Sequence, residues 1–207
     1  MSLYERYVLP HLIHLACGNE IIGRQRAKVV PAARGRVLEV GFGSGLNLAH
    51  YDAGQVEMVW ALEPSEGMRQ KAGPRLAEAP FPVEWLDLPG EAIPLEDDSA
   101  DTVLLTYTLC TIPDWAGALE QMHRVLKPGG TLLFCEHGLA PDEPARKWQD
   151  RINPVWRRLA GGCNINRPIP ELIGTAGFEI ERMDTAYLPK TPHFAGFNYW
   201  GAASPRK

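Results

Sequence analysis

The chain has 207 residues, of which 45% are hydrophobic and 22% charged, and its formal net charge is −4 at pH 7. This size and composition predict one globular domain with a full core, residues 1–207. Its basic residues are scattered rather than gathered in a stripe, which argues against a nucleic-acid-binding surface. The apolar stretch YVLPHLIHLACG near the start is shorter than the about 20 residues that a membrane span requires.

Apolar periodicity and Gly/Pro breaks predict the following elements in chain order. Helices at 4–15 and 20–30 are followed by a strand at 37–40 that runs into glycines, a strand at 57–62, a helix at 66–77 and a strand at 83–86. A strand at 101–106 and a helix at 115–126 come next, and Lys127-Pro128-Gly129-Gly130 should separate that helix from a strand at 131–135. A helix at 144–159, which Pro154 should kink or split, precedes a helix at 170–176 and strands at 178–183 and 197–203.

Strands that alternate with helices predict an α/β fold with a mostly parallel sheet covered on both faces. In such a sheet, ligands bind beyond the C-terminal ends of the strands, where the strand order reverses. The chemistry should therefore lie at the residues that follow the predicted strands.

The stretch VLEVGFGSGLNL, residues 37–48, carries Gly41, Gly43 and Gly45 directly after a predicted strand. A glycine loop alone is weak evidence, because any tight turn with positive φ also requires glycine. Glu63, however, ends the next strand roughly 20 residues later, where a carboxylate accepts ribose hydroxyls in nucleotide-binding folds. The pair predicts a cofactor that contains adenosine, either a dinucleotide or S-adenosylmethionine.

Glu39, two residues before the first glycine, discriminates between these cofactors. Its carboxylate would repel a pyrophosphate held against the loop, whereas it would attract the ammonium and sulfonium of S-adenosylmethionine. The loop also lacks the last glycine of the GxGxxG fingerprint, because Leu46 follows Gly45. These residues favour S-adenosylmethionine over a dinucleotide, although a strand-end acid that only caps backbone amides is the simpler alternative.

Several motifs now support a family resemblance, which covers nearly the whole chain from about residue 20. The ExGxGxG loop with an acid ending the second strand resembles motif I of class I S-adenosylmethionine-dependent methyltransferases. GEAIPLEDDSADTVLLTYTLCTIPD and RVLKPGGTLLF resemble the type 11 group. CEHGLA, WQDRINPVWRRLAGGCNINR and HFAGFNYWGAA resemble the methyltransferase-like thiol S-methyltransferases and their bacterial relatives.

The resemblance implies a Rossmann-like fold with a seven-stranded sheet, in which the last strand is antiparallel and inserted beside the fifth. It also implies a helical N-terminal cap at 1–30 over the active site of a catalytic core at 31–207. The cofactor-binding residues that it implies are Glu39, Gly41, Gly43, Gly45, Glu63, Pro64, Met68, Pro89, Gly90, Glu91 and Thr106. Vertebrate members carry a longer hydrophobic N-terminal anchor that this chain lacks, so membrane contact is left open.

Methyl transfer from a sulfonium requires a base only when the acceptor must lose a proton, and a thiol needs little help because its pKa is near 8.5. Glu136 and His137, just beyond the fifth strand, are the catalytic candidates, with a hydrogen-bonded strand-end pair as the alternative. The acceptor is expected to be a small molecule, with a thiol favoured by the resemblance and a lipid amine or quinone-type carbon as the runner-up. A dinucleotide-dependent oxidoreductase and a non-catalytic nucleoside-binding module are the alternatives from other classes.

Four cysteines, Cys17, Cys110, Cys135 and Cys163, show no zinc-type spacing, so the sequence predicts no metal site. Without a recognisable signal peptide, reduced thiols in a cytoplasmic protein are the default expectation. Neither the oligomeric state nor the identity of the acceptor follows from the sequence.

Overall fold

The computed structural model describes residues 4, 8–86, 88, 90 and 92–206. Its seven strands form one sheet in the order β3-β2-β1-β4-β5-β7-β6. The five strands β3, β2, β1, β4 and β5 are parallel to one another. Strand β7 is antiparallel to both of its neighbours, β5 and β6. This arrangement confirms the predicted Rossmann-like sheet with its last strand inserted beside the fifth.

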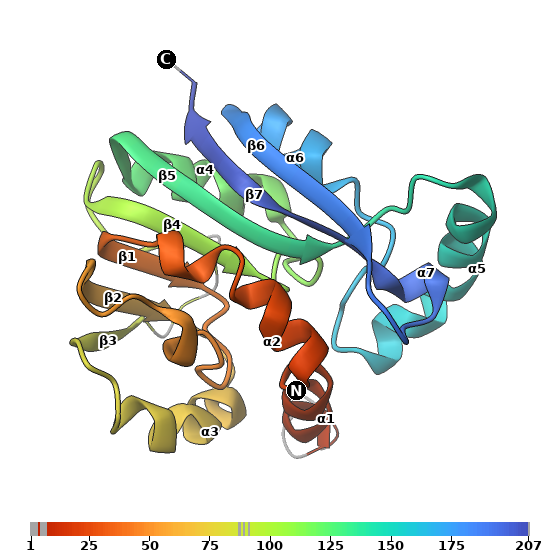
Figure 1. Ribbon diagram of the computed structural model, residues 1–207, viewed down its shortest axis with the longest axis horizontal. Helices are drawn as coiled ribbons and strands as arrows, with labels where there is room; N and C mark the ends of the chain where they lie inside the picture. Colours follow the sequence, from red (N-terminus) through yellow and green to blue (C-terminus); the bar gives the residue numbers. More distant parts are fainter. Residues whose placement is uncertain (1–3, 5–7, 87, 89, 91, 207) are drawn as a thin grey trace.

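The strands are β1 (Gly35–Val40), β2 (Val56–Leu62), β3 (Val83–Leu86), β4 (Ala100–Thr106), β5 (Leu126–His137), β6 (Phe178–Tyr187) and β7 (Phe197–Pro205). The α-helices are α1 (Leu9–Cys17), α2 (Glu20–Arg26), α3 (Glu66–Leu76), α4 (Trp115–Val125), α5 (Glu143–Leu159), α6 (Ile169–Thr175) and α7 (His193–Gly196), with 3-10 turns η2 (Val30–Ala32) and η3 (Leu48–His50). In Figure 1, α5 and α7 lie together at one end of the sheet, beyond the arrowhead of β5. Within the described residues, each helix is too short or too polar to cross a bilayer.

Both faces of the sheet are buried, which explains why the central strands read as nearly continuous apolar runs. Along β4, Val103 and Leu105 pack with α4 and α6 in one core cluster, whereas Leu104 packs in the cluster on the opposite face. The strand order reverses between β1 and β4, since β2 and β3 extend to one side and β5 to the other. The C-terminal ends of these two central strands therefore form the crevice in which such folds bind ligands.

The predicted break at Lys127 to Gly130 and the predicted split of a helix at Pro154 are wrong. Lys127 to Gly130 do not separate α4 from a later strand, because β5 begins at Leu126, directly after the helix. Leu126 pairs with Ala100 and Thr131 with Thr102, so the four residues form a bulge opposite Asp101, whose carboxylate binds the Lys127 ammonium at 2.6 Å.

Pro154 does not split α5. The residue one turn earlier, Asp150, is exposed, so water can bind the carbonyl that a proline leaves without a partner.

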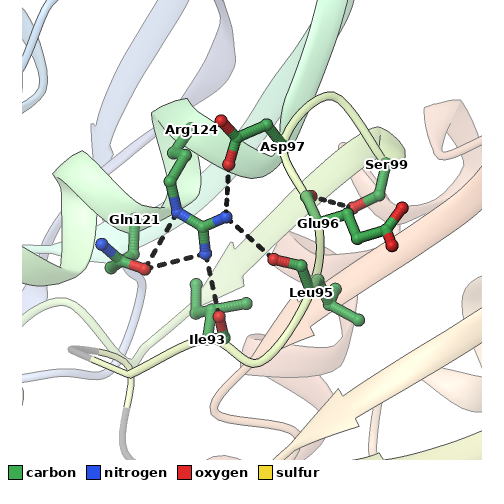
Figure 2. Close-up of polar contacts among 7 residues, drawn as sticks. All are labelled: Ile93, Leu95, Glu96, Asp97, Ser99, Gln121 and Arg124. Atoms are coloured by element: carbon green, nitrogen blue, oxygen red, sulfur yellow. Dashed lines mark hydrogen bonds and ion pairs between the residues drawn. The ribbon is translucent and has the colours of Figure 1, made fainter.

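Arg124 of α4 fixes the loop that leads into β4 (Figure 2). Its guanidinium donates to the carbonyl oxygens of Ile93 at 2.9 Å and Leu95 at 2.8 Å, and to Asp97 Oδ1 at 2.7 Å. The Nε and Nη2 groups also donate to Gln121 Oε1. These contacts use the planar array of five donors that only arginine has.

We therefore expect the substitution Arg124→Lys to destabilise the fold by about 2 kcal/mol, because three donors on a flexible stem cannot replace five in a plane. Urea denaturation of the variant against the wild-type protein measures this loss. An unchanged free energy of unfolding would mean that the loop holds its position without the guanidinium.

Candidate functional site

A cavity of about 330 Å³ opens at the C-terminal ends of β1, β2 and β4, with α1 and the end of α2 on its other side. Most of its surface is apolar. Its described lining residues are Leu9, Pro10, Ile13, His14, Cys17, Arg26, Val40, Gly41, Phe42, Gly43, Ser44, Leu46, Leu62, Glu63, Pro64, Ser65, Met68, Gly90, Thr106, Tyr107, Thr108, Thr111, Ile112, Pro113 and Gly161. The cavity thus lies at the switch point where the topology predicts a ligand.

The glycine loop after β1 needs its glycines for their backbone geometry. Gly41, Gly43 and Gly45 all have positive φ, between 60° and 75°. At Gly41 there is a second reason, because a Cβ would lie 2.2 Å from Thr108 Oγ1 in the loop after β4. Any side chain at this position would push the two central loops apart, so this glycine keeps the floor of the cavity closed.

The carboxylate of Glu63, at the end of β2, stabilises the glycine loop through a backbone hydrogen bond. Its Oε2 accepts a hydrogen bond from the Gly43 amide at 2.9 Å, and its Oε1 accepts one from the Ser65 amide at 2.8 Å. Burial raises the pKa of this carboxyl, while the two amide donors favour its ionised form. Each carboxylate oxygen has a second lone-pair site. Because Glu63 lines the cavity, it can accept further hydrogen bonds from a ligand there.

Glu39 lies beneath the cavity rather than on its surface. It is 1% exposed, and it accepts hydrogen bonds from Asn47 Nδ2 at 2.9 Å and from the Tyr51 hydroxyl at 2.6 Å. Burial raises its pKa to about 7, although both hydrogen bonds oppose that shift. Asn47 connects the carboxylate to the cavity, because its amide also donates to Thr106 Oγ1 at 2.9 Å.

Arg26, which the sequence reasoning missed, supplies a buried cation to the cavity. This last residue of α2 donates from Nη1 to Thr106 Oγ1 at 2.6 Å and to Asn47 Oδ1 at 2.9 Å. Its Nε has no partner among the described residues. Because Arg26 lines the cavity, its guanidinium is suited to bind a carboxylate there. Nothing in the sequence marks this arginine, because its partners are 21 and 80 residues away.

Glu136, at the end of β5, is fully buried and holds the loop after β4. Its Oε1 accepts hydrogen bonds from the amides of Thr108 at 2.7 Å and Leu109 at 3.1 Å. Burial raises the pKa of its carboxyl, and the amides of the loop limit that shift. The contacts are those of a strand-end acid that supports a loop, and Glu136 does not line the cavity.

His137 also lies behind that loop. Its Nε2 is 3.2 Å from Cys163 Sγ in the turn that follows α5, and its ring stacks on Tyr107 with the ring centroids 6.3 Å apart. Burial alone would lower the pKa of His137, but Cys163 and Glu136 outweigh it and the net shift is upward. The GGCNINR turn is a connection to this loop, since Asn164 donates from its backbone and its side chain to the Cys110 carbonyl.

The structure thus divides the residues proposed from the sequence into three sets. Those that line the cavity are Gly41, Gly43, Glu63, Pro64, Met68, Gly90 and Thr106. Glu39, Gly45, Glu136 and His137 lie outside that lining. Pro89 and Glu91 are not among the described residues.

Among the described residues, polar contacts connect the N-terminal helix α1 to the glycine loop and to α3. His14 Nδ1 is 2.7 Å from Ser44 Oγ in the glycine loop, and His11 Nδ1 is 2.9 Å from Lys71 Nζ on α3. Leu9, Ile13 and the remainder of its inner face add apolar surface to the cavity. This helix therefore contributes a wall of the site, whereas the strand ends contribute most of its polar groups.

Comparison with known proteins matches residues 38–134 to the methyltransferase domain family. Over 180 residues the chain is 31% identical to thiol S-methyltransferase TMT1B of Homo sapiens, a match that covers 82% of this chain and 73% of that protein. It is 32% identical over 138 residues to a demethylmenaquinone methyltransferase of Clavibacter sepedonicus, covering 66% of this chain and 56% of the relative. The crystal structure of BH2331 from Bacillus halodurans C-125 has the same fold, with a TM-score of 0.73, 16% identity, and coverage of 91% of this chain and 99% of that one.

The burial of Glu39 predicts a stability that depends on pH. The folded-state pKa of about 7 lies above the ordinary value of 4.5, so the folded protein binds the proton more tightly than the unfolded chain. The stability linked to this group is fully present below pH 4.5 and is lost as the pH rises to about 7. We expect the difference in free energy of unfolding between the wild-type protein and Glu39→Gln to change by about 3 kcal/mol between pH 4.5 and 8.

Urea denaturation of both proteins across this pH range measures the change. The side-chain amide of the variant has the same shape as the Glu39 carboxyl but does not titrate, so other buried acids cancel in the difference. A difference that stays constant with pH would show that Glu39 has the same pKa in the folded and the unfolded protein.

Proposed function

Because this chain belongs to the class I S-adenosylmethionine-dependent methyltransferases of the type 11 group, we propose that its cavity binds S-adenosylmethionine and that its acceptor is a small hydrophobic thiol. Membership of this family decides between the enzyme classes that the glycine loop left open. The observation that carries the choice of acceptor is the similarity to a thiol S-methyltransferase over 82% of the chain. The reducing cytoplasm is the proposed compartment, since all four cysteines are free.

The residues of the cavity fit the two ends of this cofactor. Glu63 accepts the ribose hydroxyls with the lone pairs that Gly43 and Ser65 leave free, and Met68 and Gly90 contact the adenine. At the other end, the guanidinium of Arg26, which lines the cavity, binds the methionine carboxylate. Glu39 acts as a positioning residue, because hydrogen bonds connect its carboxylate through Asn47 to Thr106 of the cavity wall.

The bound cofactor supplies a methyl group on a sulfonium, which transfers to the acceptor by in-line displacement. The task of the protein is to align the acceptor with that methyl group and to exclude water. Leu9, Ile13, Ile112 and Pro113 provide an apolar wall for this purpose. A thiol ionises near neutral pH, so the site needs no strong base.

In this proposal Glu136 and His137 act through the loop after β4 rather than on the acceptor. Glu136 fixes the amides of Thr108 and Leu109, and this loop carries Tyr107, Thr108 and Thr111 to the cavity wall. Neither Glu136 nor His137 lines the cavity. A thiol can therefore lose its proton to solvent before it enters the cavity.

A carbon acceptor of the quinone type is the second candidate. It is supported by the similarity to a demethylmenaquinone methyltransferase, although that match covers a smaller share of both chains. The same apolar wall would accept an aromatic ring. A carbon acceptor differs from a thiol in that it needs a base to remove a ring proton or hydroxyl proton.

We expect S-adenosylmethionine and S-adenosylhomocysteine to stabilise the protein against heat and NAD at the same concentration to leave it unchanged. At 100 times the dissociation constant, a ligand adds about 2.7 kcal/mol of stability. Methylation of small alkyl and aryl thiols, and of a demethylated quinol, is then measured by formation of S-adenosylhomocysteine. Turnover of the quinol alone would overturn the thiol assignment, and stabilisation by NAD alone would overturn the cofactor assignment.

The assignments of Arg26 and Glu63 predict different effects of two variants on ligand binding. Arg26→Gln should weaken S-adenosylhomocysteine binding by about 10- to 100-fold, because one or more charge-assisted hydrogen bonds are lost. The same variant should bind methylthioadenosine as the wild-type protein does, because that ligand has no carboxylate. Glu63→Gln should weaken both ligands, because both contain the ribose. Isothermal titration calorimetry measures these affinities, and methylthioadenosine serves as the control for folding of Arg26→Gln. Equal loss of both ligands in Arg26→Gln would contradict the assignment.

A further inference from the structure

Three side chains with soft or borderline ligand atoms meet behind the wall of the cavity. Cys110 lies in the loop after β4, His137 ends β5, and Cys163 lies in the turn after α5. Cys163 Sγ is 3.7 Å from Cys110 Sγ and 3.2 Å from His137 Nε2, and the three ligand atoms all lie within 4.8 Å of one another. None of the three side chains lines the cavity.

The backbone holds the cluster together independently of the sulfur atoms. The Cys110 carbonyl accepts hydrogen bonds from the Asn164 amide at 2.9 Å and from Asn164 Nδ2 at 3.0 Å. Glu136 fixes the amides just before Cys110, and His137 is paired with Asn198 of β7. The three side chains are therefore presented by a preformed scaffold, which lowers the entropy cost of binding a ligand.

Two of the three separations between their ligand atoms are close to those of tetrahedral coordination. With Zn–S bonds of about 2.3 Å and Zn–N bonds of about 2.0 Å, ligand atoms on a tetrahedron are separated by about 3.8 Å for two sulfurs and about 3.5 Å for sulfur and nitrogen. The observed separations of 3.7 and 3.2 Å differ from these values by a few tenths of an ångström. A disulfide would instead need the sulfurs to approach to about 2.05 Å, and it would give His137 no role.

The surroundings also suit two thiolates and a divalent cation. The Trp156 indole donates to Cys163 Sγ at 3.5 Å, and the Thr111 hydroxyl lies 3.5 Å from Cys110 Sγ. Donors of this kind around the sulfurs orient the ligands and tune a metal site. Two thiolates neutralise the charge of a divalent ion, so the ion adds no net charge to this buried region.

We propose that Cys110, His137 and Cys163 form a binding site for a thiophilic divalent ion of the zinc type, with three protein ligands and a fourth position for water or another small ligand. On binding, each of the two thiols releases its proton to solvent and forms a metal–sulfur bond. The ion would join the loop after β4 to the turn after α5. These two segments contribute Thr111 and Gly161 to the cavity, so the ion would fix that side of the cavity wall. This inference does not depend on the identity of the methyl acceptor.

Metal binding by the full chain tests the proposal. Reduced, chelator-treated protein is titrated with Co²⁺, which reports thiolate ligands by a sulfur-to-cobalt charge-transfer band, and Zn²⁺ is then added to displace it. We expect one equivalent of each ion, the charge-transfer band with the visible bands of tetrahedral cobalt, and release of about two protons per ion as the thiols ionise.

Variants locate the site. Cys110→Ser, Cys163→Ser and His137→Ala should each weaken Zn²⁺ binding by about 100-fold or more, since even outer-sphere changes cost 10- to 100-fold. Cys17→Ser is the matched control, because Cys17 is also a free cysteine in the cavity region but is outside the cluster. It should retain both the affinity and the cobalt spectrum.

The wild-type spectrum keeps the proposal testable even where a cluster variant fails to fold. A cobalt complex without the charge-transfer band, or the absence of stoichiometric binding by fully reduced protein, would overturn the site. So would equal loss of affinity in Cys17→Ser and Cys163→Ser. All of these readouts are made without cofactor or acceptor, so they are separate from the tests of the methyl-transfer proposal.

Discussion

The fully buried carboxylate of Glu136 under the loop after β4 is the interaction on which the rest of the site depends. By accepting the amides of Thr108 and Leu109, it forces the chain to turn directly after the strand. Thr108 then packs so closely on Gly41 that no side chain fits between them. The same turn places Cys110 opposite Cys163. An acid at the end of one strand thereby sets the geometry of both the cavity and the cluster behind it.

Three buried acids stand at the C-terminal ends of β2, β1 and β5, and each has a different set of donors. Glu63 is held by two backbone amides and faces the cavity, Glu39 is held by the side chains of Asn47 and Tyr51 beneath it, and Glu136 supports the adjacent loop. Burial raises the pKa of all three carboxyls. The donors offset part of this cost, and they are supplied by loops that must in any case be fixed to form a ligand site.

The sequence was sufficient where the information was local. The strand at 83–86 was predicted at its observed bounds, and the glycine loop with Glu63 located the cavity, because both signals reside in a few consecutive residues and in one topological rule. Prediction from the sequence failed where local backbone propensities compete with tertiary contacts. Pro154 and the Lys127 to Gly130 segment are breakers by propensity, yet solvent around α5 and the ion pair with Asp101 accommodate them. Arg26 and the cluster of Cys110, His137 and Cys163 could not be predicted, because only the folded chain brings their partners together.

The bulge at the start of β5 has a consequence for how this fold can change during evolution. Four residues lie opposite a single residue of β4, and regular pairing resumes at Thr131 with Thr102. An insertion or deletion in this bulge would alter only the amount of chain that loops out, and the register of the strand beyond it would be preserved. That register sets how far Glu136 and His137 reach at the opposite end. The bulge therefore separates length variation at one edge of the molecule from the geometry of the site at the other.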